Sequence, residues 1–466
     1  LGLNYQGFVE GSDITNGQLD VVVTDGFSGN VALKMAEGIS SMFTRLLRRS
    51  LNKSFLSRLG YLLARSALSE MRTHIDPRHY NGAVFLGLNG IAVKSHGGTD
   101  RIGFANAINV DLELVDHGFL RMSALLSRAP IQFLNGKMTM ADAATLMISV
   151  GSYLPERVVT NEELTAFVDT SDEWIRQRTG IAQRHIVAEG EKTSDMACHA
   201  ATQALDRAGL EAGDIDLIII ATSTPDDTFP STATKVQHRL GAHAAVAFDV
   251  QAVCAGFVYA LDVADAMLTA GRGKRALVIG AESFSKILDW SDRSTCVLFG
   301  DGAGAVILER SEDPQGYGVL ATRLHADGAH RDILYVDGGP SSSGEVGHVR
   351  MEGNKVFRHA VDKLSSVMDE VLEAADMPVS DVDWLVPHQA NIRIIEGMQK
   401  KMGLSDERVV KTVGEHANTS AASIPLALSA AVGDGRIRDG QVLAFEAIGG
   451  GLVWGAALVR YGRPAE

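Results

Sequence analysis

The sequence predicts an α/β protein whose larger part is a layered α/β/α/β/α core made of two similar halves. The main observation is an internal repeat: residues 204–221 align without gaps with residues 371–388, and each copy reads as a helix, a short polar turn and a strand. The apolar segment 276–282 is echoed in the same way by residues 442–448. Strands that are apolar throughout are typical of sheets covered by helices on both faces. Two halves of this kind therefore predict two sheets with helical layers between and outside them.

The bulk properties fit this class and exclude several others. The chain has 466 residues, 45% of them hydrophobic, and is long enough for two or three domains. A net charge of −14 argues against general nucleic-acid binding. Three cysteines without paired spacing, Cys198, Cys254 and Cys296, indicate a reducing, cytoplasmic compartment with no disulfide framework and no metal site. There is no signal peptide and no run of about 18 apolar residues, so we expect no transmembrane helix.

The N-terminal part begins with a possible anion site. We expect a buried strand over residues 19–25, a glycine turn over residues 26–30 and a helix over residues 31–39. A glycine turn before a helix N-terminus can cradle an anion, although such turns more often have no ligand. Residues 84–90 and 93–97 predict a second, glycine-rich strand pair, and a final helix begins after it.

Three stretches of this part resemble the C-terminal portion of the phosphate acyltransferase that makes acyl-phosphate from acyl-carrier protein in phospholipid synthesis. They are "DVVVTDGFSGNVALK", "FLGLNGIAVKSHG" and "GFANAI". The resemblance implies a partial Rossmann-like α/β domain over residues 1–129, without the N-terminal half of that enzyme. If the missing half is supplied, the candidate phosphate contacts are Asp25, Gly26, Gly29, Asn30 and His96. The region would otherwise be a remnant of acyl-phosphate synthesis or a non-catalytic scaffold.

A basic amphipathic stretch follows the glycine turn. No acidic residue occurs between Glu37 and Glu70, whereas six basic residues alternate there with apolar ones. Helical residues 42–66 could lie on an anionic membrane surface. A pair of solvated helices packed on their own domain or on a partner subunit is the simpler alternative, and we favour it slightly.

The two parts of the chain are joined by a predicted linker over residues 130–147, which has no strong strand or helix pattern. It reads as a connection between two normally separate proteins, and both a natural fusion and a joined gene model would produce it. Beyond the linker we expect two similar halves, residues 148–318 and 319–466.

The best candidate nucleophile is Cys254. Residues 245–250 read as a strand, and after a tight turn a long apolar helix is expected to open at Cys254. A helix N-terminus stabilises an anion and can lower the pKa of a thiol towards neutrality. A small buried cysteine used as core filler is an equally good interpretation of this stretch alone. However, His388 and Asn418 also stand at strand-to-helix turns, which together with Cys254 makes a plausible nucleophilic constellation.

The neighbours of these three residues resemble the signature stretches of β-ketoacyl-[acyl-carrier-protein] synthase III, the condensing enzyme that starts type II fatty-acid synthesis. They are "DVQAVCAGF", "VPHQANIRII", "HANTSAASIPLAL" and "EAIGGGLVWGAALV", within a resemblance from about residue 148 to 463. It implies the thiolase architecture, a homodimer, acyl-coenzyme A and acyl-carrier protein as substrates, and no metal or redox cofactor. The sequence departs from the pattern of this family at Ile448, because the resemblance leads us to expect an aromatic residue at that position.

The resemblance also implies a role for each residue. Cys254 would be the nucleophile, and His388 and Asn418 would donate hydrogen bonds to an enolate oxygen. The backbone N–H groups of Cys254 and Gly450 would form the oxyanion hole. Asn391 is expected to support the site rather than take part in the chemistry.

Two clusters are candidate substrate contacts. Residues 170–180 combine a helix N-cap, an indole and arginines, and can stack on adenine and bind phosphates, unless they are an ordinary surface helix. By resemblance, Trp174, Arg178 and Arg293 hold the nucleotide end of coenzyme A. Phe229 matches a ring that reaches into the partner subunit's acyl tunnel, which favours a short primer such as acetyl.

A predicted helix over residues 391–401 carries the second cluster. Arg393, Lys400 and Lys401 are spaced by seven and eight residues, so they share one face. We expect this face to recruit the acidic acyl-carrier protein, although a solvated helix face is the simpler alternative without the adjacent motif.

The sequence argues against one related activity and leaves a second one open. A degradative thiolase would carry a second catalytic cysteine near residues 447–452, and none stands there. A related synthase for polyketide or quinolone starter units would keep the same three residues and differ in its primer. Cys198 and Cys296 are expected to be buried structural residues.

Overall fold

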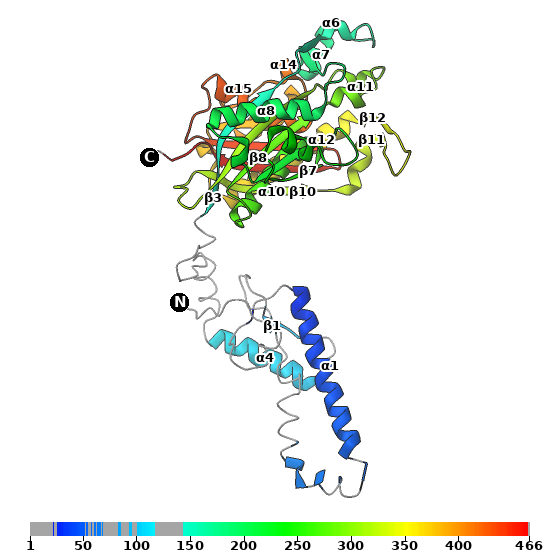
Figure 1. Cartoon of the computed structure of the whole chain (residues 1–466), viewed down its shortest axis with the longest axis vertical. Coiled ribbons are helices and arrows are strands. Elements are labelled where there is room, and N and C mark those ends of the chain that lie inside the picture. Colours follow the sequence, from blue (N-terminus) through cyan, green and yellow to red (C-terminus); the bar gives the residue numbers. More distant parts are fainter. Residues whose placement is uncertain are drawn as a thin grey trace. The chain divides into compact units, whose positions relative to one another are not determined.

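The computed structural model describes residues 143–464 without a break, together with shorter pieces between residues 22 and 116 (Figure 1). The chain divides into two compact units, residues 1–141 and residues 142–466, and each is described by itself.

The C-terminal unit is built on two sheets. The first sheet has the strand order β3 (Ala144–Tyr153), β9 (Gly302–Ser311), β8 (Arg275–Glu282), β6 (Leu217–Ala221) and β7 (Val246–Val250). The second has the order β10 (Gly318–Ala326), β15 (Val453–Arg460), β14 (Val442–Gly449) and β13 (Trp384–Pro387). Strand β6 runs parallel to β7 and β8, and β13 runs parallel to β14, whereas β9 and β15 run antiparallel to their neighbours.

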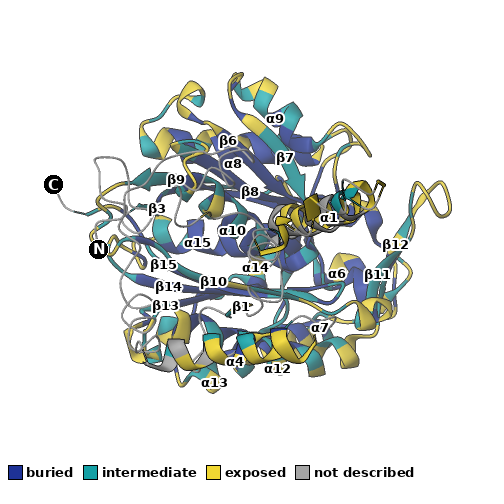
Figure 2. Ribbon diagram, turned by 90° about the horizontal axis from the view of Figure 1, so that it is seen from below, coloured by how far each residue is buried: buried dark blue, intermediate teal, exposed yellow. Residues whose placement is uncertain are grey.

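Helices cover both faces of each sheet, and the dark-blue buried residues of Figure 2 mark the layers between them. Helices α8 (Thr193–Ala208) and α9 (Thr232–Leu240) pack on the outer face of the first sheet. Helices α10 (Gly256–Thr269) and α15 (Ser423–Gly433) lie between the sheets. Helix α12 (Gly353–Ala374) packs on the outer face of the second sheet, and α13 (Ile392–Met402) packs against α12. The five-layered α/β/α/β/α prediction is confirmed.

The internal repeat is confirmed at the level of elements. In the first half α8 leads through the short 3-10 helix η3 (Ala212–Asp214) into β6. In the second half α12 leads through η7 (Val379–Asp381) into β13. The echoed apolar segments form β8 and β14, each the parallel neighbour of the repeat's strand. The carboxyl ends of corresponding strands are therefore the places where residues of both halves can meet.

The first sheet begins earlier than the sequence predicted. Strand β3 starts at Ala144, so the last four residues of the predicted linker 130–147 lie in a strand. Leu146 and Met147 are buried there, because this strand pairs with β9 and faces the core on both sides. The second half begins with β10 at Gly318, beside the predicted boundary.

Shorter elements connect the layers. They are β4 (Arg157–Thr160), α6 (Asn161–Leu164), α7 (Asp172–Thr179), β5 (Gln183–Ile186), η4 (Val253–Ala255), η5 (Phe284–Ile287), α11 (Arg293–Cys296), η6 (Gly328–Ile333), β11 (Leu334–Gly338), β12 (Val346–Met351), η8 (Asp406–Arg408), α14 (Val413–His416) and η9 (Ser420–Ala422).

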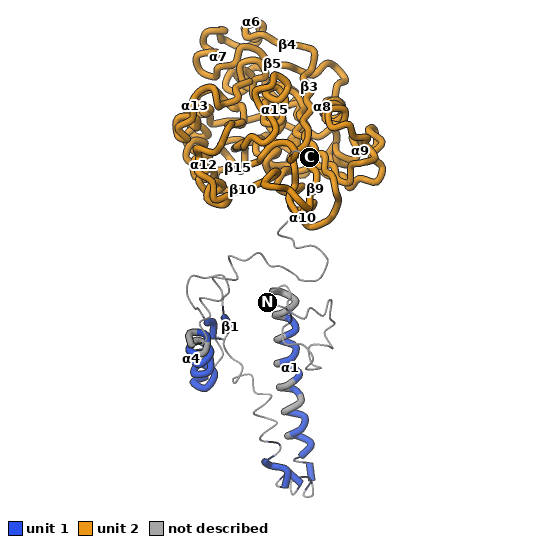
Figure 3. The backbone as a smooth tube through the Cα atoms, turned by 90° about the vertical axis from the view of Figure 1, so that its left-hand side faces the viewer, with its two compact units in different colours: residues 1–141 blue, residues 142–466 orange. Residues whose placement is uncertain are grey.

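The N-terminal unit is drawn in blue in Figure 3. Helix α1 (Gly26–Leu51) precedes a two-stranded antiparallel sheet of β1 (Ala83–Val84) and β2 (Val93–Lys94), and α4 (Arg101–Asp116) follows. The predicted final helix is confirmed, and of the predicted strands 84–90 and 93–97 the described residues 84, 93 and 94 lie in a strand whereas Ser95 does not. None of the described helices is both long and apolar enough to cross a membrane.

The start of this unit corrects one prediction. Residues 26–30, predicted as a glycine turn, are the first turns of α1. Each glycine costs a helix only about 1 kcal/mol, which the helix-favouring residues after them offset. Val22, the described residue of the predicted strand 19–25, is exposed and outside any strand. The candidate contacts Gly26, Gly29 and Asn30 thus lie in a helix, whereas the Asn30 side chain, Asp25 and His96 lie outside the described residues.

The basic stretch is helical through the end of α1 and at several described positions between 57 and 68. On α1 the apolar side chains that are exposed follow a spacing of three or four residues, so they share one face. They are Val31, Met35, Ile39, Met42 and Leu46.

The two halves of the C-terminal unit touch through backbone at Gly280 of β8. A Cβ atom on Gly280 would lie 2.2 Å from the carbonyl oxygen of Ala421 and 3.1 Å from the Cα atom of Ala422. Neither atom belongs to a movable side chain, so this contact fixes η9 against the end of β8.

We predict that Gly280→Ala destabilises the protein by about 1–3 kcal/mol, because the added methyl overpacks this contact. Thermal unfolding followed by circular dichroism measures the effect. Gly213→Ala is the matched control, since a Cβ atom there meets nothing within 4 Å. Equal melting temperatures for the two variants would show that η9 can move away from β8.

Candidate active site

Cys254 lies in a single 3-10 turn between β7 and α10. This turn, η4, ends at Ala255, so α10 opens at Gly256 and not at Cys254 as predicted. Val253 holds the turn with a positive φ of 46°, a conformation that a β-branched residue rarely adopts. The Cys254 side chain is buried.

Burial decides the resting state of this thiol. It raises the pKa of Cys254 to about 12, although hydrogen bonds from Ser420 and from its own backbone act in the opposite direction. The predicted lowering towards neutrality is therefore wrong for the free protein, because loss of hydration outweighs the nearby helix N-terminus. Burial also lowers the pKa of His388 to about 3. The resting pair is a neutral thiol and a neutral imidazole.

His388 follows β13 and is held by backbone and by its neighbour Gln389. The His388 N–H donates to the carbonyl of Glu446 on β14 at 2.8 Å. The Gln389 N–H donates to the Ser423 hydroxyl at 2.6 Å, and its side-chain oxygen accepts from the N–H groups of Thr412 and Val413. Gln389 thereby joins the His388 turn to α14 and α15, a role that the sequence analysis missed.

Asn418 is tied to the first half of the fold. Its N–H donates to Leu298 at 2.9 Å, and its carbonyl accepts from Gly300 at 3.0 Å. Its side-chain oxygen accepts from the Ser420 N–H at 2.9 Å. Because that oxygen is occupied by a donor, the amino group is the end of the amide that can donate, as the predicted role requires.

The glycine run after β14 lies against the cysteine. A Cβ atom on Gly449 would be 2.7 Å from the Cys254 backbone nitrogen, and one on Gly450 would be 2.6 Å from the carbonyl oxygen of Leu334. Only glycines allow so close an approach. Gly450 as an oxyanion-hole donor stays a prediction. Ile448 is buried on the other face of β14, with the core of the second sheet.

The three predicted residues are all buried, and contacts connect the turns that carry them, because His388 is bonded to β14 and η4 packs against β14. Cys254 comes from the first half, and His388 and Asn418 come from the second. The turn η4 packs against both β14 and η9, and within η9 the Ser420 N–H donates to the Asn418 side chain. A nucleophile and two hydrogen-bond donors in a dry site suit acyl transfer through a covalent thioester.

The predicted coenzyme A contacts also come together. The guanidinium carbons of Arg178 and Arg293 lie 4.9 and 4.7 Å from the ring centroid of Trp174. Ser171 caps α7 by accepting from the Trp174 N–H, and Arg293 donates to the carbonyl of Asp169 at 2.6 Å. Both arginines are exposed, so this indole between two cations is accessible to a ligand.

The predicted carrier-protein contacts lie on α13. Arg393, Lys400 and Lys401 are all exposed, and Asn391 caps the helix by accepting from the Arg393 N–H at 2.8 Å. Arg393 also donates to the Gln177 carbonyl of α7 at 3.4 Å. Phe229 is 83% exposed in this single chain.

The remaining predictions concern structural residues. Cys198 and Cys296 are buried, as expected. The described residues contain no group of three or more His, Cys, Asp or Glu side chains that could hold a metal ion.

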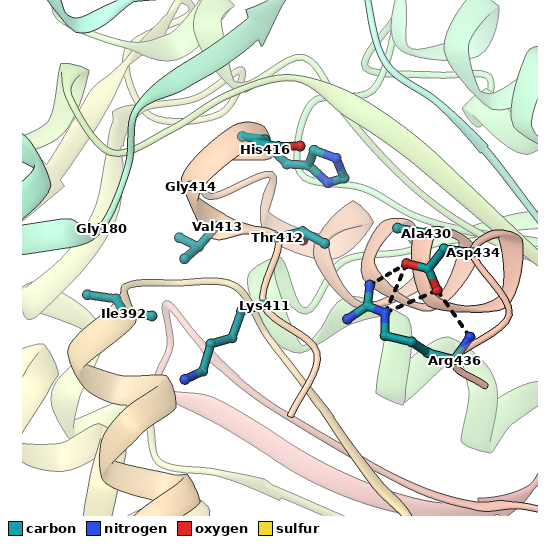
Figure 4. A pocket seen from close by; sticks show the side chains of 11 residues that line it. Gly180, Ile392, Lys411, Thr412, Val413, Gly414, His416, Ala430, Asp434 and Arg436 are labelled. Carbon is teal, nitrogen blue, oxygen red and sulfur yellow. Dashed lines mark hydrogen bonds and ion pairs between the residues drawn. The ribbon is translucent and has the colours of Figure 1, made fainter. Parts of the chain in front are cut away.

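A separate pocket of about 500 Å³ lies beside α14 (Figure 4). Its lining residues are Gly180, Ile392, Lys411, Thr412, Val413, Gly414, Glu415, His416, Ala430, Asp434 and Arg436. Burial lowers the pKa of His416 to about 4, and Asp434 pairs with Arg436 at 2.7 Å. None of the three candidate catalytic side chains lines it.

Comparison with family models covers both parts of the chain. Residues 248–328 match the model described as 3-oxoacyl-[acyl-carrier-protein (ACP)] synthase III, and residues 372–461 match its C-terminal model. Residues 1–122 match the model described as fatty acid synthesis protein.

Individual relatives cover the C-terminal unit. The β-ketoacyl-[acyl-carrier-protein] synthase III of Paramagnetospirillum magneticum is 63% identical over 317 residues, which span 67% of this chain and 98% of that protein. The crystal structure of 3-oxoacyl-[acyl-carrier-protein] synthase III from Aquifex aeolicus superposes with a TM-score of 0.65 at 47% identity, covering 68% of this chain and all of that one. The priming β-ketosynthase of the R1128 polyketide pathway gives a TM-score of 0.66 at 32% identity, covering 72% of this chain and all of that one.

We predict that Glu446→Gln stabilises the protein more at pH 8 than at pH 5. Glu446 is buried, its Oε2 atom has no partner among the described residues, and burial raises its pKa from 4.5 to about 8. Between these two values the unfolded carboxyl has lost its proton while the folded one keeps it, so stability falls as pH rises. The variant lacks this loss, which amounts to a few kcal/mol.

Melting temperatures of both proteins at pH 5, 6.5 and 8 measure this difference. Other titrating groups are common to the two proteins and cancel. A difference that stays constant across this range would contradict the burial of an uncompensated carboxyl beside the His388 strand.

Proposed function

Because the chain belongs to the β-ketoacyl-[acyl-carrier-protein] synthase III family, we propose that its residues 148–463 condense acetyl-coenzyme A with malonyl-acyl-carrier protein to start fatty-acid synthesis. The observation that supports the proposal is that Cys254, His388 and Asn418 are all buried and that the Cys254 turn packs against β14 and η9, the neighbours of the other two. This combination serves a reaction that needs a nucleophile first and an enolate-binding site afterwards.

In the first stage Cys254 loses its proton and attacks the acetyl thioester carbonyl. The oxyanion is held by the N–H groups of Cys254 and Gly450, each worth about 3 kcal/mol of barrier in sites of this type. Coenzyme A leaves as a thiolate and takes up a proton, and an acetyl thioester remains on Cys254. The indole of Trp174 with Arg178 and Arg293 would hold the nucleotide end of the donor.

In the second stage malonyl-acyl-carrier protein enters and loses carbon dioxide. The electrons of the broken C–C bond pass to the thioester oxygen as an enolate, which His388 and Asn418 stabilise by donating hydrogen bonds. A pKa of about 3 keeps His388 neutral, so its imidazole N–H acts as a donor and not as an acid. The enolate carbon then attacks the acetyl group and releases Cys254. No metal or redox cofactor takes part, because decarboxylation supplies the carbanion and drives the reaction.

Exposed residues on the surface of the C-terminal unit indicate which proteins it would bind. The basic face of α13 (Arg393, Lys400 and Lys401) would recruit the acidic acyl-carrier protein. Phe229 would reach into the acyl tunnel of a second copy, so the enzyme would act as a homodimer in the cytoplasm. An exposed phenylalanine ring is expensive to leave in water, which supports a covering partner.

For residues 1–129 we propose a domain related to acyl-phosphate synthesis, which joins phospholipid and fatty-acid synthesis in one chain. The match of residues 1–122 to the fatty acid synthesis protein model supports this origin. In that activity the N-terminal turns of α1, with Gly26, Gly29 and Asn30, would face the phosphate. Exposed apolar side chains on α1 and the basic residues of 42–66 suit peripheral contact with an anionic membrane.

A second candidate, a polyketide starter-unit synthase, is favoured by the similarity to the R1128 priming synthase. It would use the same three residues and differ only in primer length. Quinolone starter synthesis would differ in the same way.

We predict that mixing with acetyl-coenzyme A adds the mass of one acetyl group to the protein and none to Cys254→Ala. Intact-protein mass spectrometry reads the result directly. Cys198→Ala, which removes another buried thiol, is the control and should be acetylated like the parent. Acylation by butyryl- or isobutyryl-coenzyme A faster than by acetyl-coenzyme A would favour the starter-unit candidate, and no adduct with any donor would refute both.

We predict that Lys400→Glu raises the KM for malonyl-acyl-carrier protein about tenfold, which corresponds to about 1.4 kcal/mol. The rate of Cys254 acetylation should not change, since that stage involves no carrier protein. Lys274→Glu is the charge-matched control, because Lys274 is exposed at the opposite end of β8 from the site. Equal KM values for the two variants would show that the carrier protein docks elsewhere.

A further inference from the structure

The carboxyl group of Glu282 is buried at the end of β8 and is surrounded by hydrogen-bond donors. The Ser223 N–H lies 3.1 Å from each carboxyl oxygen, and the Thr224 hydroxyl lies 2.6 Å from Oε2. The Ser420 hydroxyl lies 3.1 Å from Oε1. These partners are amides and hydroxyls, with no basic side chain among them. Keeping a buried carboxylate ionised without a cation beside it costs free energy, and this points to a function for Glu282.

Ser420 connects this carboxyl to the candidate nucleophile. Its hydroxyl donates to Glu282, and its N–H donates to the Asn418 side chain. Its turn η9 packs against η4, the turn that holds Cys254, and Ser420 acts to lower the pKa of that thiol. The φ of 49° at Ser420 is unusual for a residue with a side chain. The backbone contact between Gly280 and Ala421 holds the turn in this place. These contacts fix the backbone that carries the Ser420 hydroxyl beside Glu282.

We propose that Ser420 and Glu282 form a proton relay that takes up the Cys254 thiol proton during acylation. The proposal rests on Cys254 acting as the nucleophile. As the Sγ–H bond breaks, the proton passes to the Ser420 oxygen, and the Ser420 hydroxyl proton passes to Glu282. The products are a thiolate that accepts from Ser420 and a neutral carboxylic acid.

Over the two stages of the reaction, the proton that the relay takes up from Cys254 is returned to it. In the first stage the departing thiolate of coenzyme A takes its proton from solvent. In the second stage Cys254 leaves the condensation adduct as a thiolate, and Glu282 returns the stored proton through Ser420. The negative charge only moves from a buried carboxylate to a buried sulfur, so no second buried charge is created. His388 stays neutral throughout and remains a donor for the enolate.

The surroundings of Glu282 suit a proton acceptor that works near neutral pH. Burial, the largest influence, raises the pKa of Glu282 to about 7, and the hydrogen bonds from Thr224, Ser223 and Ser420 oppose it. The segment after β6 contributes hydroxyls and an amide, η9 contributes Ser420 and the Ala421 N–H, and η4 contributes Cys254, the titratable group that interacts with Glu282. Thiol and carboxyl therefore titrate as a pair.

The test is the rate of Cys254 alkylation by iodoacetamide between pH 5.5 and 9, followed by intact mass. This probe reports the thiolate without any acyl donor. In the parent we expect the rate to rise with a midpoint near pH 7, as Glu282 becomes able to accept the proton. In Glu282→Gln we expect at least a tenfold slower rate at pH 7.5 and a midpoint shifted upward.

Asp265→Asn is the matched control, because Asp265 on α10 is another carboxyl whose pKa is raised by burial. It should alkylate like the parent. Ser420→Ala breaks the relay at its centre and leaves Glu282 in place. We expect it to slow alkylation as much as Glu282→Gln does, and the double variant to be no slower than either single one.

Three results would overturn the relay: an unchanged pH profile in Glu282→Gln, normal alkylation in Ser420→Ala, or losses that multiply in the double variant. Melting temperatures confirm that each variant is folded. Failure of the proposed condensation has a different signature, since the parent would then alkylate at Cys254 but would not be acetylated.

Discussion

Loss of hydration at the junction of the two halves sets the chemistry of this protein. Cys254, His388 and Glu282 are all buried there, and burial makes the charged form of each one costly. The thiol and imidazole are consequently neutral at rest, and the carboxyl is poised near neutrality. A reaction in such a place proceeds best by moving one charge along hydrogen bonds, and the Ser420 link between Cys254 and Glu282 provides that route.

The internal repeat explains why this junction exists. Each half presents the carboxyl ends of its parallel strands, β6 and β8 in one and β13 and β14 in the other. The turns after these strands carry the site, and direct backbone contacts such as Gly280 against Ala421 and Gly449 against Cys254 hold them together. Stability and activity therefore depend on the same few glycines, because any Cβ atom at these places would separate the halves.

Much of this could be predicted from the sequence. The internal repeat and the apolar strand patterns predicted the layers of the fold. The sequence stretches around Cys254, His388 and Asn418 identified these three residues as candidates. Ser420, Glu282 and Gln389 could not be found in the same way, since their roles arise from partners distant in sequence. The pKa of Cys254 was predicted in the wrong direction because local position at a helix start was visible and burial was not. The prediction for residues 26–30 was wrong for a similar reason, since their glycines indicated a turn where the chain begins a helix.

The most direct test of the account is the condensation itself, with acetyl-coenzyme A labelled with ¹³C at the carbonyl and unlabelled malonyl-acyl-carrier protein. The account predicts that the label appears in C3 of a 3-oxobutyryl group on the carrier protein, with one carbon dioxide released per product and none of either with Cys254→Ala. Label transferred to the carrier protein as a simple acetyl group, without release of carbon dioxide, would contradict it. The chain would then be an acyl transferase that has kept the architecture of a condensing enzyme without its second stage.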